Sequence, residues 1–158
     1  MKGVLHTDGG ARGNPGPAGI GVVLQSRDGQ PPLEVARSIG EATNNVAEYH
    51  ALIAGLELAR DNHISEIEVY VDSELVASQV QGKWKIKNDR LRALAGRAQS
   101  LMAQFESASI TPVRRHLNER ADELANQAMD EAAALLPHNG DPGTLSLELD
   151  AAMPAEDM

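Results

Sequence analysis

Residues 2–10 read Lys-Gly-Val-Leu-His-Thr-Asp-Gly-Gly and combine a strand pattern with an acidic residue at its end. Gly3, Leu5 and Thr7 share one face of the expected strand, and the residues between them share the other. The strand is expected to end at Asp8, because residues 9–19 are rich in Gly and Pro and favour a turn that feeds a hairpin. An acidic side chain therefore stands at the carboxyl end of the first expected strand.

The next segments predict a hairpin followed by a helix. Strands are expected at 19–26 and 33–39, with the turn signal Asp28-Gly29 between them. Apolar residues at helical spacing from Val46 to Ala59 predict a helix, with Thr43 or Asn44 as its N-cap.

The rest of the chain continues the alternation of strands and helices. Residues 66–72 alternate again, and a strand, a helix and a strand in succession imply a right-handed crossover and parallel pairing. Asn118 is the expected N-cap of the last helix, whose apolar stripe ends at Leu135. Further elements are predicted as helices at 73–80, 88–105 and 118–136 and a strand at 108–114.

Four acidic residues fall at related places in this pattern. Asp8 and Asp72 end two strands that we expect to be parallel neighbours, and the carboxyl ends of such strands carry functional groups. Glu48 and Asp122 fall in the first turns of two expected helices. Clustered carboxylates repel one another unless a cation joins them, and hard oxygen ligands favour Mg²⁺ or Mn²⁺. The set therefore indicates metal-assisted chemistry on a phosphate ester.

The totals are compatible with one domain and an acidic tail. The chain has 158 residues, no Cys and a net charge of −9. Residues 137–158 hold five acidic residues and no Lys or Arg, so we expect a domain at 1–136 and a flexible tail at 137–158. The alternative is that Leu145, Leu147 and Leu149 form a strand or dock on the domain. The lack of Cys and of long apolar runs favours a cytoplasmic protein that does not enter membranes.

The four acidic residues stand in motifs that resemble type I ribonuclease H over residues 1–136. The motifs are Asp8-Gly9-Gly10, Thr43-Asn44-Asn45-x-Ala47-Glu48, Tyr70-Val71-Asp72-Ser73 and Asn118-x-x-Ala121-Asp122-x-Leu124-Ala125. The resemblance implies an α/β ribonuclease H-like fold, with a five-stranded mixed sheet in the order 3-2-1-4-5 flanked by helices. It also implies endonucleolytic hydrolysis of the RNA strand of RNA–DNA hybrids, leaving 5′-phosphate and 3′-hydroxyl ends.

The resemblance makes the four carboxylates the catalytic, metal-binding set. Two ions about 4 Å apart serve the attacking and leaving oxygens of such a reaction. Asp8 is the best candidate to bridge both ions because it lies on the central strand, and Glu48 is placed to orient the RNA 2′-hydroxyl. An isolated Asp-Gly or first-turn acid is usually only a turn or helix-start residue, so the argument rests on all four motifs in order.

Substrate-binding residues are expected on both sides of this set. The resemblance assigns minor-groove contacts to Asn14, Asn44 and Asn45 and a DNA-strand phosphate to Thr43. Trp84 among lysines either stacks on the nucleic acid or anchors its turn, and the excess of basic residues at 83–97 favours a phosphate partner. The full expected set is Gly9, Gly10, Asn14, Thr43, Asn44, Asn45, Lys83, Trp84, Lys85 and Arg115.

Two departures place the chain in a subgroup of the resembled family. The histidine usually found about ten residues before the last Asp has no counterpart, since His116 lies closer to Asp122. Arg115 instead fits a Val-x-Arg-x-x-Asn pattern. The segment 81–88 is too short for the basic handle that some members carry after the third acidic motif.

Two other functions remain as alternatives. One is a nuclease of the same fold that acts on duplex RNA or DNA. The other is a hybrid-binding module with a degraded site, which the four intact acidic residues argue against because clustered carboxylates repel phosphate. We expect a monomer that takes an RNA–DNA hybrid as its partner.

Overall fold

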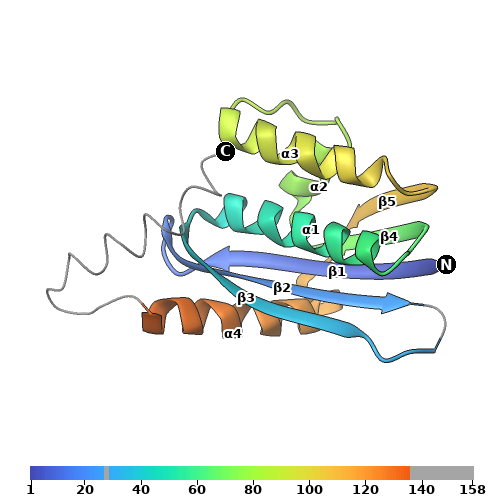
Figure 1. The fold of residues 1–158 in the computed structure, drawn as a ribbon. Helices are drawn as coiled ribbons and strands as arrows, with labels where there is room; N and C mark the ends of the chain where they lie inside the picture. The colour runs from blue at the N-terminus through green and yellow to red at the C-terminus, as the bar shows by residue number, and fades with distance from the viewer. Residues whose placement is uncertain (27–28, 136–158) are drawn as a thin grey trace, which may run out of the picture.

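The computed structural model describes residues 1–26 and 29–135. It contains a five-stranded sheet in the order β3-β2-β1-β4-β5, so the predicted topology is confirmed. Helices α1, α2 and α3 lie on one side of the sheet and α4 lies on the other (Figure 1). The elements are β1 (Lys2–Ala11), β2 (Gly16–Ser26), β3 (Leu33–Ala42), α1 (Asn44–Asp61), β4 (Glu66–Val71), α2 (Glu74–Val80), α3 (Asp89–Met102), β5 (Ser107–Pro112), the short 3-10 helix η1 (Arg115–Leu117) and α4 (Glu119–Leu135).

Strand β1 lies at the centre of the sheet and pairs differently on its two sides. Its pairing with β4 is parallel and runs from Lys2 opposite Glu66 to Thr7 opposite Val71. Its antiparallel pairing with β2 continues to Ala11, so the prediction that the strand ends at Asp8 is wrong. The glycines after Asp8 continue the ladder with β2 instead of turning. Asp8 therefore lies where the parallel pairing stops, although the strand itself goes on.

The side of the sheet covered by α1 holds the larger apolar side chains. The predicted stripe on α1 is buried, and Leu52 and Leu56 are fully covered together with Leu5 and Val69 of the sheet. Burial of such side chains is the main contribution to folding, at about 1.5–3 kcal/mol for each. This packing fixes α1 against β1 and so sets the position of every residue that α1 carries.

Helix α4 packs on the opposite side by close contact between small residues. A Cβ at Gly21 of β2 would lie 2.1 Å from the carbonyl oxygen of Ala121, and one at Gly19 would lie 2.5 Å from the Cβ of Ala128. Only glycine at these positions lets the helix backbone approach the sheet so closely. The predicted stripe holds as far as Ala132, but Leu135 is 63 % exposed, so its predicted burial is wrong.

Two expectations, that the chain does not enter membranes and that it ends in a flexible tail, concern more of the chain than the described residues. None of the α-helices in the described part of the chain combines the length and apolar character that a bilayer-spanning segment needs. The predicted tail at 137–158, and the alternative strand of Leu145, Leu147 and Leu149, lie outside the described residues.

Candidate active site

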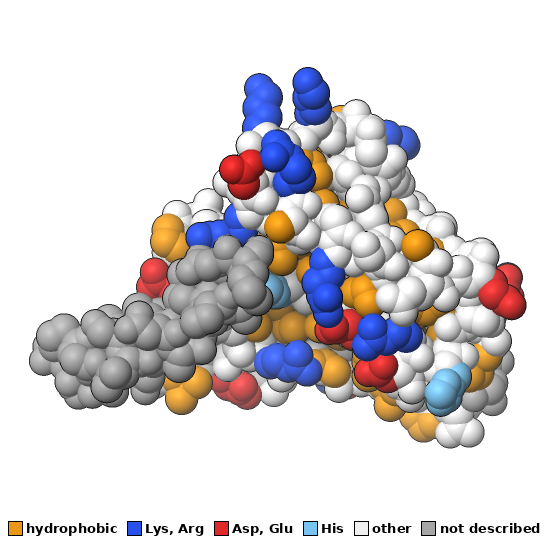
Figure 2. Space-filling view, turned by 45° about the horizontal axis from the view of Figure 1, so that its top comes forward, with side chains coloured by type: hydrophobic (Ala, Val, Ile, Leu, Met, Phe, Trp, Pro, Cys, Tyr) orange, Lys and Arg blue, Asp and Glu red, His pale blue; other side chains and the backbone are white. Residues whose placement is uncertain are grey.

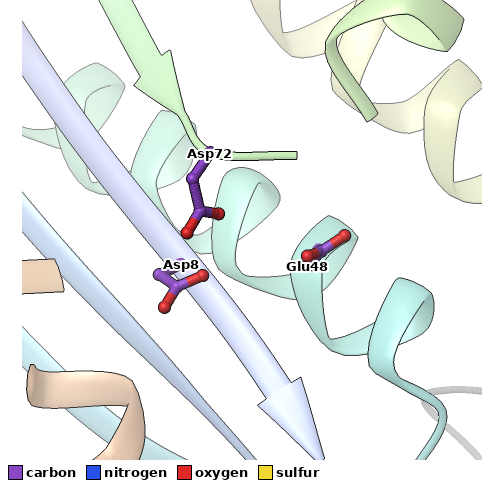
Figure 3. Close-up of side chains that lie close together, drawn as sticks. All are labelled: Asp8, Glu48 and Asp72. Atoms are coloured by element: carbon purple, nitrogen blue, oxygen red, sulfur yellow. The ribbon is translucent and has the colours of Figure 1, made fainter. Parts of the chain in front are cut away.

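Three carboxylates converge at the end of the parallel ladder. Asp8 comes from β1, Asp72 follows the last residue of β4, and Glu48 comes from α1 (Figure 3). One carboxylate oxygen from each residue lies within 4.8 Å of the others. Strand pairing accounts for the first two, because Thr7 and Val71 are opposite each other in the ladder. The fold confirms the sequence-based expectation that Asp8 and Asp72 lie close together.

Glu48 reaches the cluster through a close contact between α1 and β1. Helix α1 begins at Asn44, so Glu48 lies beyond its first turn and the first-turn prediction is wrong. A Cβ at Gly9 would lie 2.2 Å from the carbonyl oxygen of Ala47. The glycine after Asp8 therefore lets the helix backbone contact the strand, which brings Glu48 beside Asp8.

The fourth acidic residue, Asp122, joins Asp8 from the first turn of α4. A hydrogen bond between the two carboxyl groups and their charge repulsion both raise the pKa of Asp8. Asp8, Glu48 and Asp122 line one surface depression of about 230 Å³. All four acidic residues predicted from the sequence are thus gathered at one place.

Asn118 links the two elements that carry Asp8 and Asp122. Its side chain is buried, and Nδ2 donates a hydrogen bond of 2.9 Å to the carbonyl oxygen of Thr7. Its own carbonyl oxygen accepts from the backbone N–H of Asp122 at 3.0 Å. Asn118 therefore occupies the N-cap position of α4, as predicted, but its side chain does not cap the helix, because Oδ1 has no hydrogen-bond partner among the described residues. The side chain binds the central strand instead.

Burial and mutual repulsion change the acidity of the cluster. Burial, followed by the charge of Asp72, raises the pKa of Asp8 to about 9. Burial also raises the pKa of Glu48 to about 7, while a hydrogen bond from Ser73 and the charge of Arg115 act in the opposite direction. Carboxyl groups in such surroundings retain protons near neutral pH unless a cation replaces them. The electrostatics of the site therefore favour a bound cation.

The predicted residue Arg115 lies at the edge of the cluster. Its Nε is 3.7 Å from Oδ2 of Asp72, and its side chain is 78 % exposed. It lines the same depression as the carboxylates. The neighbouring His116 is exposed and is not among the residues that line this depression.

The predicted polar residues around the start of α1 form an interlocked group. Oδ1 of Asn14 accepts from the backbone N–H of Asn44 at 3.0 Å, and Oδ1 of Asn44 accepts from that of Ala11 at 3.2 Å. Oγ1 of Thr43 accepts from the backbone N–H of Val46, which confirms Thr43 as the N-cap. Since backbone donors occupy the side-chain oxygens, each asparagine presents its NH₂ group as a donor. Asn45 is half-buried in the same turn.

The basic loop, residues 81–88 between α2 and α3, lies apart from this depression. Lys83, Trp84 and Lys85 are exposed, and Trp84 keeps 45 % of its surface accessible. Figure 2 shows Lys and Arg side chains gathered where α3 and the loop before it lie. This exposure leaves part of the ring accessible for stacking, and it is equally compatible with the alternative of a partly buried anchor for the turn. Gly9 and Gly10, by contrast, line the carboxylate depression.

Sequence reasoning missed two residues of the site. Ser73, next to Asp72, caps α2 by accepting from Val76 and also bonds Glu48. Arg12 lines the carboxylate depression from the loop after β1. Its position four residues after Asp8 was a signal, but the Gly- and Pro-rich surroundings were interpreted only as a turn.

Comparisons with known proteins agree with this fold. The reverse transcriptase-like family matches residues 6–128, which places the domain in that class. The Mycobacterium tuberculosis protein named bifunctional protein Rv2228c is 47 % identical over 146 residues, covering 92 % of this chain and 40 % of the relative. Ribonuclease HI of Halobacterium salinarum is 51 % identical over 127 residues, covering 80 % of this chain and 64 % of the relative.

Solved structures narrow the class further. The crystal structure of RNase H1 from Halobacterium salinarum matches with a TM-score of 0.80 and 48 % identity, covering 83 % of this chain and 99 % of that chain. LC11-RNase H1, solved in complex with an RNA/DNA hybrid, matches with a TM-score of 0.76 and 42 % identity, covering 82 % and 98 %. The chain belongs to the ribonuclease H family of enzymes. It spans less than two thirds of the length of the mycobacterial and archaeal relatives.

Proposed function

We propose that the protein hydrolyses the RNA strand of RNA–DNA hybrids endonucleolytically, with divalent metal, and leaves 5′-phosphate and 3′-hydroxyl ends. The observation that carries this proposal is the convergence of Asp8, Glu48 and Asp72, with oxygens within 4.8 Å, beside Asp122. Ribonuclease H relatives, one of them solved with an RNA/DNA hybrid, support the choice of substrate.

The carboxylate cluster fits two Mg²⁺ or Mn²⁺ ions. Its donors are hard oxygens and they lie beside a surface depression. The pKa values of Asp8 and Glu48 are raised, first by burial and then by the neighbouring negative charge of Asp72. Asp8, Glu48 and Asp72 would hold one ion, and Asp8 with Asp122 would hold the other. Bound ions would supply an activated water and stabilise charge on the phosphate and the leaving oxygen.

The chain's own residues would orient the substrate around this centre. Asp8 follows Thr7, which pairs with β2 on one side and with β4 on the other, and Asp8 itself pairs with β2. The backbone that carries the carboxylate is therefore fixed before the substrate binds. Glu48 would accept a hydrogen bond from the RNA 2′-hydroxyl, the group by which a protein distinguishes RNA from DNA. Arg115, at the edge of the depression, would contact a phosphate.

The asparagine group would bind the minor groove without reading the base sequence. Asn14 and Asn44 present amide donors because their oxygens are occupied by backbone N–H groups. Every base pair offers acceptors in the minor groove, so such donors suit any sequence. The hydroxyl proton of Thr43 would serve a DNA-strand phosphate. Lys83, Trp84 and Lys85 would add phosphate and stacking contacts farther along the hybrid.

The decisive experiment presents one labelled sequence as RNA–DNA hybrid, duplex RNA and duplex DNA, with and without Mg²⁺ or Mn²⁺. We expect internal cleavage of the RNA strand of the hybrid, dependent on metal, and products whose 3′ ends can be extended by a polymerase. The Asp8→Asn variant is the control for contaminating nuclease. Equal cleavage of duplex RNA would favour the broader nuclease, and tight binding without cleavage would favour a binding module.

A further inference from the structure

Arg12 lies at the rim of the carboxylate depression with a fixed backbone and an exposed side chain. The backbone N–H of Arg12 donates to the carbonyl oxygen of Pro17 at 2.8 Å. A Cβ at Gly16 would lie 2.0 Å from the carbonyl oxygen of Arg12. The loop between β1 and β2 is therefore closed tightly around the Arg12 backbone. The side chain extends from this fixed point beside the residues proposed to bind metal.

The guanidinium of Arg12 is held on α4 by two side chains. Nη1 lies 2.7 Å from Oδ1 of Asp130, and Nη2 donates to Oδ1 of Asn126 at 3.3 Å. The pair is exposed, 45 % for Arg12 and 66 % for Asp130, and ion pairs of this kind contribute little to stability. Nδ2 of Asn126 in turn donates to the carbonyl oxygen of Asp122 at 2.9 Å. One amide therefore connects the guanidinium to the turn that carries Asp122.

We propose that Arg12 binds a phosphate of the RNA strand next to the cleavage position. In the free protein Asp130 pairs with the Arg12 guanidinium, and the phosphate takes the place of Asp130 when the hybrid binds. This inference rests on the proposed function. Arg12 and Arg115 are the basic side chains that line the depression in the described part of the chain. Arg115 lies beside Asp72 and Arg12 beside Asn126, so the two cations border the carboxylates at separate points.

The chemistry of the Arg12 side chain and the weakness of its ion pair with Asp130 both support the exchange of Asp130 for a phosphate. A guanidinium offers a planar fork of N–H donors that matches two oxygens of a phosphate. Its pairing with Asp130 keeps the positive charge near the site and off the carboxylates, where it would compete with metal ions. A weak exposed pair can be exchanged for a phosphate at small cost, and Asn126 can remain bound throughout.

The test measures hybrid binding as a function of salt in the inactive Asp8→Asn background, by fluorescence anisotropy with the full chain. Arg12→Gln should weaken binding several-fold at low salt and reduce the slope of log K against log salt by about 0.9, the value for one phosphate contact. Asp130→Asn should strengthen binding, because it releases Arg12. The double variant should lose that gain.

Glu131→Gln is the matched control, because it removes the same charge from the neighbouring position of α4. Binding strengthened equally by Glu131→Gln and Asp130→Asn, or a gain retained in the double variant, would overturn the proposal in favour of a general charge effect. If Arg12→Gln lowers the melting temperature, Arg12→Lys decides the question: it should keep the salt slope but weaken binding.

When a neutral methylphosphonate replaces the phosphate beside the cleavage position in the RNA strand, Arg12→Gln should no longer weaken hybrid binding. The same group in the DNA strand should leave its effect intact, and the reverse pattern would overturn the assignment to the RNA strand. If the Asp8→Asn protein shows no preference for hybrid over duplex DNA, the proposed function itself fails. If hybrid binds normally and the salt slope is unchanged by Arg12→Gln, only the inference about Arg12 fails.

Discussion

The carboxylate cluster and the basic loop at residues 81–88 are held by the fold in opposite ways. Asp8 is only 9 % exposed and lies on the central strand, whereas Trp84 is 45 % exposed in a connection between two helices. Burial raises the pKa of Asp8, while the lysines of the loop remain in water. The difference leads us to expect that the basic loop contributes to affinity and not to chemistry, so substitutions in the loop and in the carboxylate cluster should have separate effects.

The strongest test of this separation is Asp8→Asn. We expect hydrolysis of the hybrid to fall at least roughly a thousandfold, about 4 kcal/mol in the barrier, because the central ligand loses its charge. The measurement is single-turnover cleavage with saturating Mg²⁺. Turnover close to that of the unmodified protein would remove Asp8 from the mechanism and end the comparison.

Glu48→Gln should affect catalysis alone. We expect a loss of roughly a hundredfold or more in cleavage rate, with hybrid affinity changed by less than about twofold. The amide keeps the shape of the side chain but loses the charge of a metal ligand. Rates and dissociation constants are measured on the same preparation. A parallel collapse of affinity would assign Glu48 to binding.

The buried cluster should make the stability of the metal-free protein depend on pH. The pKa of Asp8 rises from 3.8 to about 9 on folding, so the folded state keeps a proton that the unfolded chain releases. This contribution is complete below the unfolded value and is lost as the pH rises through the folded value. We expect the free energy of unfolding in EDTA to fall by about 1–3 kcal/mol between roughly pH 5 and pH 9.

Urea unfolding at several pH values measures this dependence. The Asp8→Asn variant is its control, because it removes the titrating group, and it should be less dependent on pH and more stable at high pH. Identical pH profiles for the two proteins would show that repulsion within the cluster does not limit stability.

The basic loop provides the opposite case. Trp84→Ala should weaken hybrid binding about five- to tenfold, the lower part of the range of about 1–3 kcal/mol for a stacked base. The rate at saturating substrate should be unchanged, since the loop does not line the carboxylate depression. Steady-state kinetics separate KM from kcat. A fall in kcat without a change in KM would contradict the separation of the two regions.

The smallest effect is expected for His116→Ala. The side chain is exposed on η1 and does not line the depression, so the cleavage rate should fall less than about threefold, under 1 kcal/mol. Arg115→Ala on the same turn is the matched comparison and should reduce the rate more. A loss for His116→Ala as large as that for Asp8→Asn would give the histidine a part in the chemistry.

The fold was largely predictable because its elements carry clear local patterns. Alternation in β1 and β4 and helical spacing in α1 fixed the elements, and the crossover rule then made β1 and β4 parallel neighbours. The boundaries were less predictable where glycine was interpreted as a turn residue. Residues 9–11 continue β1 because backbone pairing with β2 does not require side chains.

The candidate site was predictable in its acidic residues and less so in their supports. Strand ends and the helix pattern identified the four carboxylates, but a cap position could not reveal that Asn118 binds Thr7, more than a hundred residues away in the chain. Arg12 was missed for the same reason, because its partners on α4 are distant in sequence.

The sequence by itself determined the order of strands and helices and the identity of the acidic side chains, since these follow from local periodicity and from motifs of a few residues. Only the tertiary structure decided how the carboxylates meet. The Gly9 contact that brings Glu48 beside Asp8, the burial that raises the pKa of Asp8, and the bonds of Asn118 and Arg12 all join distant segments. Local patterns do not encode such contacts, because packing alone determines which backbone positions approach one another and how much water they exclude.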